Sequence, residues 1–125
     1  MYILIILIFC LFSCNDDFKN VEQIDINLQN KSNFKIDSLK LFMADISEYK
    51  CDSILVKDIL PNIENSVFWK NFNSCKTDGN YIVKAFYNNK IIERKVGYYT
   101  NGLILDKKIV INVYNDSIVA TTIRK

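Results

Sequence analysis

The pair Asn88-Asn89, with a hydrophobic segment on each side, constrains the fold of this chain more than any other feature. Residues 81–87 and 90–98 flank the pair and are rich in aromatic and β-branched side chains. Asparagine tolerates the positive φ that both central residues of a type I′ turn adopt, and this turn joins two antiparallel strands. The sequence therefore predicts a β-hairpin centred on Asn88-Asn89.

The register that this turn imposes gives the hairpin two different faces. It places Lys84 across from Glu93 on one face, where opposite charges stabilise the pairing. The opposite face carries the pairs Ala85–Ile92, Tyr81–Val96 and Val83–Arg94, and all of these residues except Arg94 are apolar. Arg94 is the exception on the apolar face, which predicts that its strand lies at an edge or an end of the core.

Other segments also have the side-chain pattern of strands. Ile24, Ile26 and Leu28 alternate with polar residues, a period of two that indicates a half-buried strand. The further predicted strands are 39–43, 53–60 before Pro61, and a second hairpin of 108–114 and 117–123 around Asn115-Asp116. In this second hairpin, Val113 faces Ile118 and Ile111 faces Ala120.

Three segments allow less definite predictions. Residues 45–51 are polar and fit either a loop or one helical turn. Residues 65–72 fit an aromatic strand or a short helix capped by Asn65. Residues 73–80, which contain Asp78-Gly79, have the composition of a turn region.

About seven strands in roughly 100 residues, with turns every 8–12 positions, predict an all-β fold. The expected architecture is an antiparallel β-sandwich, either immunoglobulin-like or transthyretin-like. Such sandwiches support unrelated functions, so this fold class does not identify an activity.

An apolar run from Tyr2 to Phe12 precedes this domain. As a helix it would cover roughly 16 Å, about half of a ~30 Å hydrocarbon core, so it is too short to span a membrane. Its length suits the hydrophobic region of a secretory signal. No lysine or arginine lies between Met1 and Ser13, although such signals normally begin with positive charge, so we expect that the natural start lies upstream or that the signal is a minimal one.

The run ends in Leu11-Phe12-Ser13-Cys14, followed by Asn15-Asp16-Asp17. This motif resembles the lipobox and the mature N-terminus of envelope lipoproteins from Bacteroidetes. The resemblance implies a diacylglycerol thioether on Cys14 and an outer-membrane location, facing the periplasm or the cell surface. It divides the chain into a signal peptide (1–13), a lipidated tether (14–20) and one domain (21–125).

The chain has four cysteines, and the lipoprotein interpretation accounts for Cys10 and Cys14. Cys51 and Cys75 remain as an even pair in an oxidising compartment, which predicts a disulfide closing a loop of about 25 residues. The alternative is two separate thiols, one of them buried.

Three serines follow an aspartate and precede an apolar residue: Ser38, Ser53 and Ser117. The form resembles the sequon at which Bacteroidetes attach O-linked glycans to exported proteins, so these serines are candidate glycosylation sites. The alternative is that Asp-Ser is a turn dipeptide before a strand.

Residues typical of catalysis and of metal binding are few. The chain has no histidine, no glycine-rich phosphate loop and no Cys-x-x-Cys pair, so we expect neither an enzyme nor a cofactor or metal. With a formal net charge of +2 and basic residues scattered singly along the sequence, we expect no nucleic-acid partner.

Aromatic residues are the remaining candidates for a binding surface. Trp69 is expected in the core, whereas Tyr98 and Tyr99, close to Asn101-Gly102, are candidates for exposure near a loop. The expected role is a lipid-anchored binding or structural protein with an envelope protein or a glycan as partner. The alternative role is an immunity or inhibitor lipoprotein that neutralises a toxin or a hydrolase, and a small hydrolase ranks third.

Overall fold

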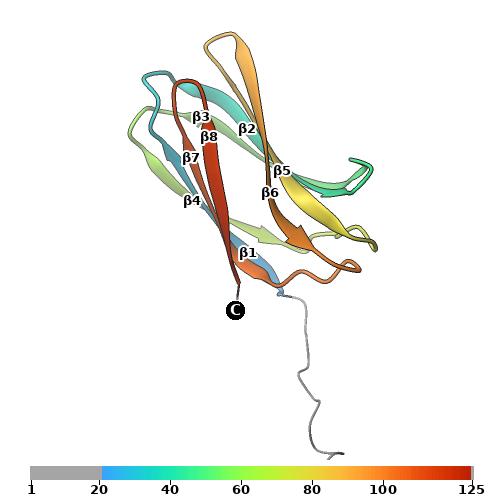
Figure 1. Cartoon of the computed structure of the whole chain (residues 1–125). Helices are drawn as coiled ribbons and strands as arrows, with labels where there is room; N and C mark the ends of the chain where they lie inside the picture. Colours follow the sequence, from blue (N-terminus) through green and yellow to red (C-terminus); the bar gives the residue numbers. More distant parts are fainter. Residues whose placement is uncertain (1–20, 125) are drawn as a thin grey trace, which may run out of the picture.

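The computed structural model describes residues 21–124, which form eight β-strands in two sheets (Figure 1). The strands are β1 (Gln23–Asn30), β2 (Ile36–Asp45), β3 (Lys50–Ile59), β4 (Glu64–Lys70), β5 (Gly79–Tyr87), β6 (Lys90–Tyr99), β7 (Asp106–Val113) and β8 (Ile118–Arg124). Within this range there is no helix long and apolar enough to cross a membrane. The predicted signal (1–13) and tether (14–20), with the lipid site Cys14, lie outside the described residues.

The two sheets have the strand orders β4-β1-β7-β8 and β3-β2-β5-β6, called sheet A and sheet B below. The all-β sandwich prediction is confirmed, with one strand more than the seven expected. Because β1 and β2 lie in different sheets, the arrangement corresponds to the transthyretin-like alternative and not to the immunoglobulin order. Strand β1 also pairs in parallel with β7, a pairing that the antiparallel prediction did not include.

Both predicted hairpins have the predicted register. Asn88 and Asn89 have φ values of 50° and 57°, as a type I′ turn requires. Ala85 faces Ile92 in the first hairpin, and Val113 faces Ile118 in the second. Strand β6 is an edge strand, so the exposed position of Arg94 agrees with the prediction made from its place on the apolar face.

The less definite segments also have defined structures. Residues 64–70 form strand β4 and not a helix, and Trp69 is 4 % exposed in the core. Residues 46–49 form a tight connection between β2 and β3. Gly79, expected in a turn, is the first residue of β5.

The core lies between the facing sides of the two sheets. Strand β1 contributes Ile24, Ile26 and Leu28, each at most 2 % exposed, and β5 contributes Tyr81 and Val83 from the other sheet. Burial of alternating apolar side chains removes their surface from water, which is the main favourable term in folding. The alternation read from the sequence thus determines which face of each sheet is buried.

The connections gather at two ends of the sandwich. The Val21 end carries the start of β1 and the loops 46–49, 71–78 and 100–105. The opposite end carries the loops 31–35, 60–63, 88–89 and 114–117. At this opposite end the buried Asn30 side chain donates hydrogen bonds to the carbonyls of Phe34 (2.8 Å) and Ile59 (2.9 Å), which ties the end of β1 in sheet A to the end of β3 in sheet B.

Candidate functional site

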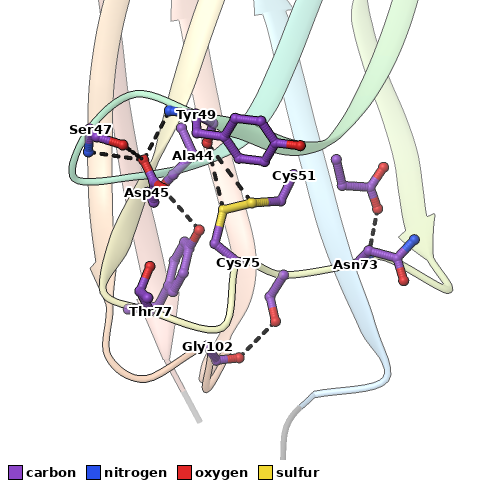
Figure 2. Close-up of a disulfide and its surroundings, with 12 residues drawn as sticks. Ala44, Asp45, Ser47, Tyr49, Cys51, Asn73, Cys75, Thr77 and Gly102 are labelled. Atoms are coloured by element: carbon purple, nitrogen blue, oxygen red, sulfur yellow. Dashed lines mark hydrogen bonds between the residues drawn. A yellow bond between two sulfur atoms is a disulfide. The ribbon is translucent and has the colours of Figure 1, made fainter.

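A disulfide between Cys51 and Cys75 joins two connections at the Val21 end (Figure 2). Cys51 lies at the start of β3 and Cys75 lies in the loop 71–78, with Cα atoms 5.4 Å apart. The two sulfur atoms contact the carbonyl oxygen of Tyr49 at 3.9 and 3.7 Å. The bond therefore links the β2–β3 connection to the β4–β5 connection.

Backbone and side-chain hydrogen bonds extend this link to the loop 100–105, which connects β6 to β7. The Ser74 hydroxyl donates to the Gly102 carbonyl at 2.8 Å, and the Gly102 N–H donates to Thr77 at 3.0 Å. The N–H of Val21 donates to the Ile104 carbonyl at 3.0 Å, so the start of β1 belongs to the same assembly. The Val21 end is consequently one connected unit and not a set of independent loops.

Tyr98 and Tyr99 separate in the structure, which corrects the prediction of a shared surface. Tyr99 is 2 % exposed, and its hydroxyl donates to the Ala44 carbonyl at 3.0 Å. Tyr98 is 49 % exposed, and its hydroxyl donates to Asp78 at 3.0 Å. Successive side chains of a strand point to opposite faces, so two adjacent tyrosines on β6 are not both available to a partner.

Two aspartates organise the loops of this end. Asp45 accepts hydrogen bonds from the Ser47 hydroxyl (2.7 Å) and from the N–H groups of Ser47 and Tyr49 (both 2.9 Å). The bond from the Ser47 side chain, followed by the backbone bonds, lowers the pKa of Asp45. The pKa of Asp78 is lowered mainly by the N–H of Asn101, which donates at 2.9 Å.

These lowered pKa values predict that the loops loosen in acid. A carboxyl whose folded pKa lies below its unfolded value contributes stability above the unfolded value, near pH 4, and loses it as the pH falls through the folded value. We expect amide-exchange protection of Tyr49 and Asn101 to fall below about pH 4. The amide of Asn33 is the control, because it donates to the non-titrating Asn115 side chain at 2.8 Å. Equal behaviour of all three amides would contradict this role for the carboxylates.

The β2–β3 connection also exposes two large apolar side chains. Ile46 is 77 % exposed and Tyr49 is 70 % exposed, the highest values among the large apolar residues described. The hydrogen bonds to Asp45 hold the backbone on which both side chains lie. Neither residue could be identified from the sequence, because an isolated apolar residue in a polar segment has no periodic signal.

The three candidate glycosylation serines lie at separate positions. Ser53, on β3, and Ser117, in the turn before β8, are exposed, whereas Ser38 on β2 is half-buried. The structure does not bring them together, and each remains a separate candidate for modification.

Five lysines that are scattered in the sequence share the outer face of sheet B. Phe42, Ala44 and Ile82 form a small apolar cluster on this face, separate from the main core. The ammonium groups of Lys40 and Lys50 lie 5.1 and 4.5 Å from the centre of the Phe42 ring, which places both lysines over this cluster. The remaining lysines, at outward-facing register positions of β3, β5 and β6, are Lys57, Lys84 and Lys95.

Lys40 and Lys84 are direct neighbours across the β2–β5 pairing. Like charges in this position destabilise a sheet. Glu93 forms an ion pair with Lys84 at 3.1 Å, and Glu48 pairs with Lys95, but the ion pairs found among residues 21–124 provide no acidic partner for Lys40. The pKa of Glu48 is lowered mainly by the hydrogen bond from the Lys95 side chain and, to a lesser extent, by the positive charge of Lys95. The five lysines thus exceed the acidic residues around them, and we call these five lysines the lysine face.

The outer face of sheet A has a different character. Its charged side chains are balanced, with Asp25 beside Lys108 and Glu64 and Lys70 at the two ends of β4. Its other outward positions include uncharged polar residues, namely Gln23, Asn27, Gln29, Ser66, Asn112 and Thr121, and the exposed apolar residues Phe68, Val119 and Ile123. This face provides a control surface of the same architecture without an excess of charge.

Asp106 is the one buried acidic or basic residue among residues 21–124. Asp106 is fully buried, and the Arg124 Nε donates to its Oδ1 at 3.4 Å. Burial, followed by the charge of Asp106, raises the pKa of Tyr81. The Asp106 side chain is 1 % exposed, so a substrate cannot reach this carboxylate in the folded domain. Among residues 21–124 no three His, Cys, Asp or Glu side chains gather as a metal site.

Comparison with protein-family models, with curated proteins and with solved structures finds no match to this chain.

Proposed function

We propose that this chain is a lipid-anchored protein of the bacterial cell envelope that binds an acidic partner protein through the lysine face. The adjacent pair Lys40 and Lys84 carries this proposal. Glu93 compensates Lys84, but the ion pairs among residues 21–124 leave Lys40 uncompensated, so an anionic group beside Lys40 would offset this like-charge contact. A destabilising arrangement at a surface is expected where a protein uses the same residues for binding.

Two observations support the location in the envelope. The apolar run before Ser13-Cys14 has the length and the ending of a lipoprotein signal. The Cys51–Cys75 disulfide supports export, because structural disulfides form mainly in oxidising compartments.

The apolar residues next to the lysines favour a protein over a glycan as the partner. Leu55 is 47 % exposed at the β3 edge of the lysine face, and Ile91 is 59 % exposed at its β6 edge. A protein surface supplies both carboxylates for the lysines and aliphatic groups for Leu55 and Ile91. A polyanionic glycan supplies only the first of these.

The proposed role is non-catalytic. The runner-up role, an immunity or inhibitor lipoprotein, uses the same surface with a toxin or a hydrolase as the partner. One assay distinguishes the two roles. If the captured partner is an enzyme and loses its activity when it is mixed with an equal concentration of this protein, the inhibitor role is supported.

Charge reversal on the lysine face is expected to weaken capture of the partner. A photo-crosslinking amino acid at position 55, in the full chain in its native membrane, would label the partner. We expect the double variant K40E/K84E to need at least about tenfold more partner for equal labelling, a change of about 1.4 kcal/mol. K70E/K108E is the matched control, because it also reverses two lysines, both on the outer face of sheet A. Equal losses in both variants, or a crosslinked product that resists proteases, would contradict an acidic protein partner.

Neutralising Lys40 alone is expected to stabilise the domain while it weakens binding. K40Q keeps a long polar side chain and removes the repulsion with Lys84, so the free energy of unfolding should rise by about 0.2–1 kcal/mol. Urea denaturation of K40Q and the wild type measures this difference. Because K40Q also removes the contact of Lys40 with the Phe42 ring, the same substitution is made in a K84Q background, and an equal effect of K40Q in both backgrounds would show that the pair is not repulsive.

A further inference from the structure

The exposed apolar pair Ile46 and Tyr49 lies at the end of the sandwich from which the tether leaves. Val21, the first described residue, donates to Ile104 in the loop 100–105, and this loop is bonded to Thr77 and Ser74. Cys75, from the same segment, is joined by the disulfide to Cys51, next to the β2–β3 connection. This chain of contacts places Ile46 and Tyr49 at the Val21 end.

The distance between this end and a lipid on Cys14 is limited by the sequence. Val21 lies seven positions after Cys14, with six residues between them. A fully extended chain spans at most about 3.6 Å per residue, so the Val21 end would lie within about 25 Å of the bilayer surface. The loops of the opposite end are farther from the tether by the length of the strands.

We infer that the β2–β3 connection docks on the bilayer, with Ile46 and Tyr49 in the headgroup region. This inference rests on the proposed lipid anchor. Tyrosine favours membrane–water interfaces, where its ring is partly buried and its hydroxyl remains hydrated. Lys76, an exposed lysine of the loop 71–78 at this end, would supply positive charge to anionic headgroups.

The rigidity of the connection suits this contact. The two acidic residues of the segment are both engaged, Asp45 by Ser47 and Tyr49 and Glu48 by Lys95. Because these bonds and the disulfide hold the backbone before contact, little conformational entropy is lost on docking. Docking would hold the strands away from the bilayer and leave the lysine face open to a partner.

Fluorescence quenching in vesicles tests this inference. The full chain, purified with its lipid, is reconstituted into vesicles of phosphatidylethanolamine and phosphatidylglycerol, with or without brominated acyl chains. Y49W adds a tryptophan at the proposed contact, and Y114W adds one at the opposite end, where Tyr114 is 37 % exposed. Trp69 stays in both variants as a buried background signal. If Y49W alters the connection, I46W provides a second probe.

We expect brominated lipids to quench most of the emission added by Y49W and none of that added by Y114W. Vesicle-bound protein with no quenching of Y49W, or with equal quenching of both variants, would overturn the docking and leave the anchor intact. Protein that does not float with the vesicles, and that behaves like the C14A variant, would overturn the anchor and the docking together.

Discussion

Removing the Cys51–Cys75 disulfide is expected to lower the free energy of unfolding by about 3 kcal/mol. The bond spans 24 positions of the sequence and restricts the unfolded chain, which is the main source of this stabilisation in the chain-entropy model. For a domain of this size, the loss corresponds to a fall in melting temperature of about 10–20 °C. Thermal unfolding of the wild type and of C51S/C75S measures the effect.

Adding a reductant supplies the control for this experiment. It should lower the melting temperature of the wild type to nearly that of C51S/C75S, and it should leave the variant unchanged. A variant as stable as the oxidised wild type would show that the hydrogen bonds of the three loops hold the Val21 end without the disulfide.

Replacing Gly79 with alanine is expected to destabilise the domain by about 3 kcal/mol, at the upper end of the usual range for overpacking. A Cβ atom on Gly79 would lie 2.2 Å from the Ala44 carbonyl oxygen and 2.5 Å from the Tyr99 ring. The Ala44 oxygen belongs to the backbone of β2 and also accepts the Tyr99 hydroxyl, so it cannot move away without breaking that bond. Urea denaturation of G79A measures the cost.

Two further variants separate overpacking from other effects. N80A changes the neighbouring half-buried residue and should stay within about 0.5 kcal/mol of the wild type. Y99F removes the hydroxyl without adding volume and should cost about 1 kcal/mol, the value of one hydrogen bond. A G79A variant as stable as N80A would contradict the close packing of β5, β2 and Tyr99.

Local features of the fold could be predicted from the sequence because local chemistry determines them. The Asn88-Asn89 turn sets the register of its own hairpin, so every pair predicted from it occurs in the structure. The parallel pairing of β1 with β7 joins Ile26 to Ile109, far apart in the chain, and no turn residue specifies it. The choice between two sandwich topologies therefore needed the structure.

The candidate site was harder to predict from the sequence, because its residues also come from segments far apart in the chain. The five lysines of the lysine face come from four strands, and they meet only when the order β3-β2-β5-β6 is known. Tyr98 and Tyr99 were indistinguishable because the face that each occupies depends on the strand ends around Gly97, where φ is +65°. The close packing of Gly79 could not be predicted either, because Asp78-Gly79 has the composition of a turn, whereas a glycine marks close approach of another backbone when it lies in a strand.

The intact mass of the protein purified from its native membrane tests the central claim most directly. We predict a chain that begins at Cys14 with a diacyl or triacyl increment, an increment that the C14A variant lacks. The same spectrum should show two hydrogens fewer than the reduced chain, from the Cys51–Cys75 bond, and hexose-type increments would support glycosylation at the Asp-Ser sites. A mass that retains Met1 and carries no lipid would contradict the lipid-anchored account.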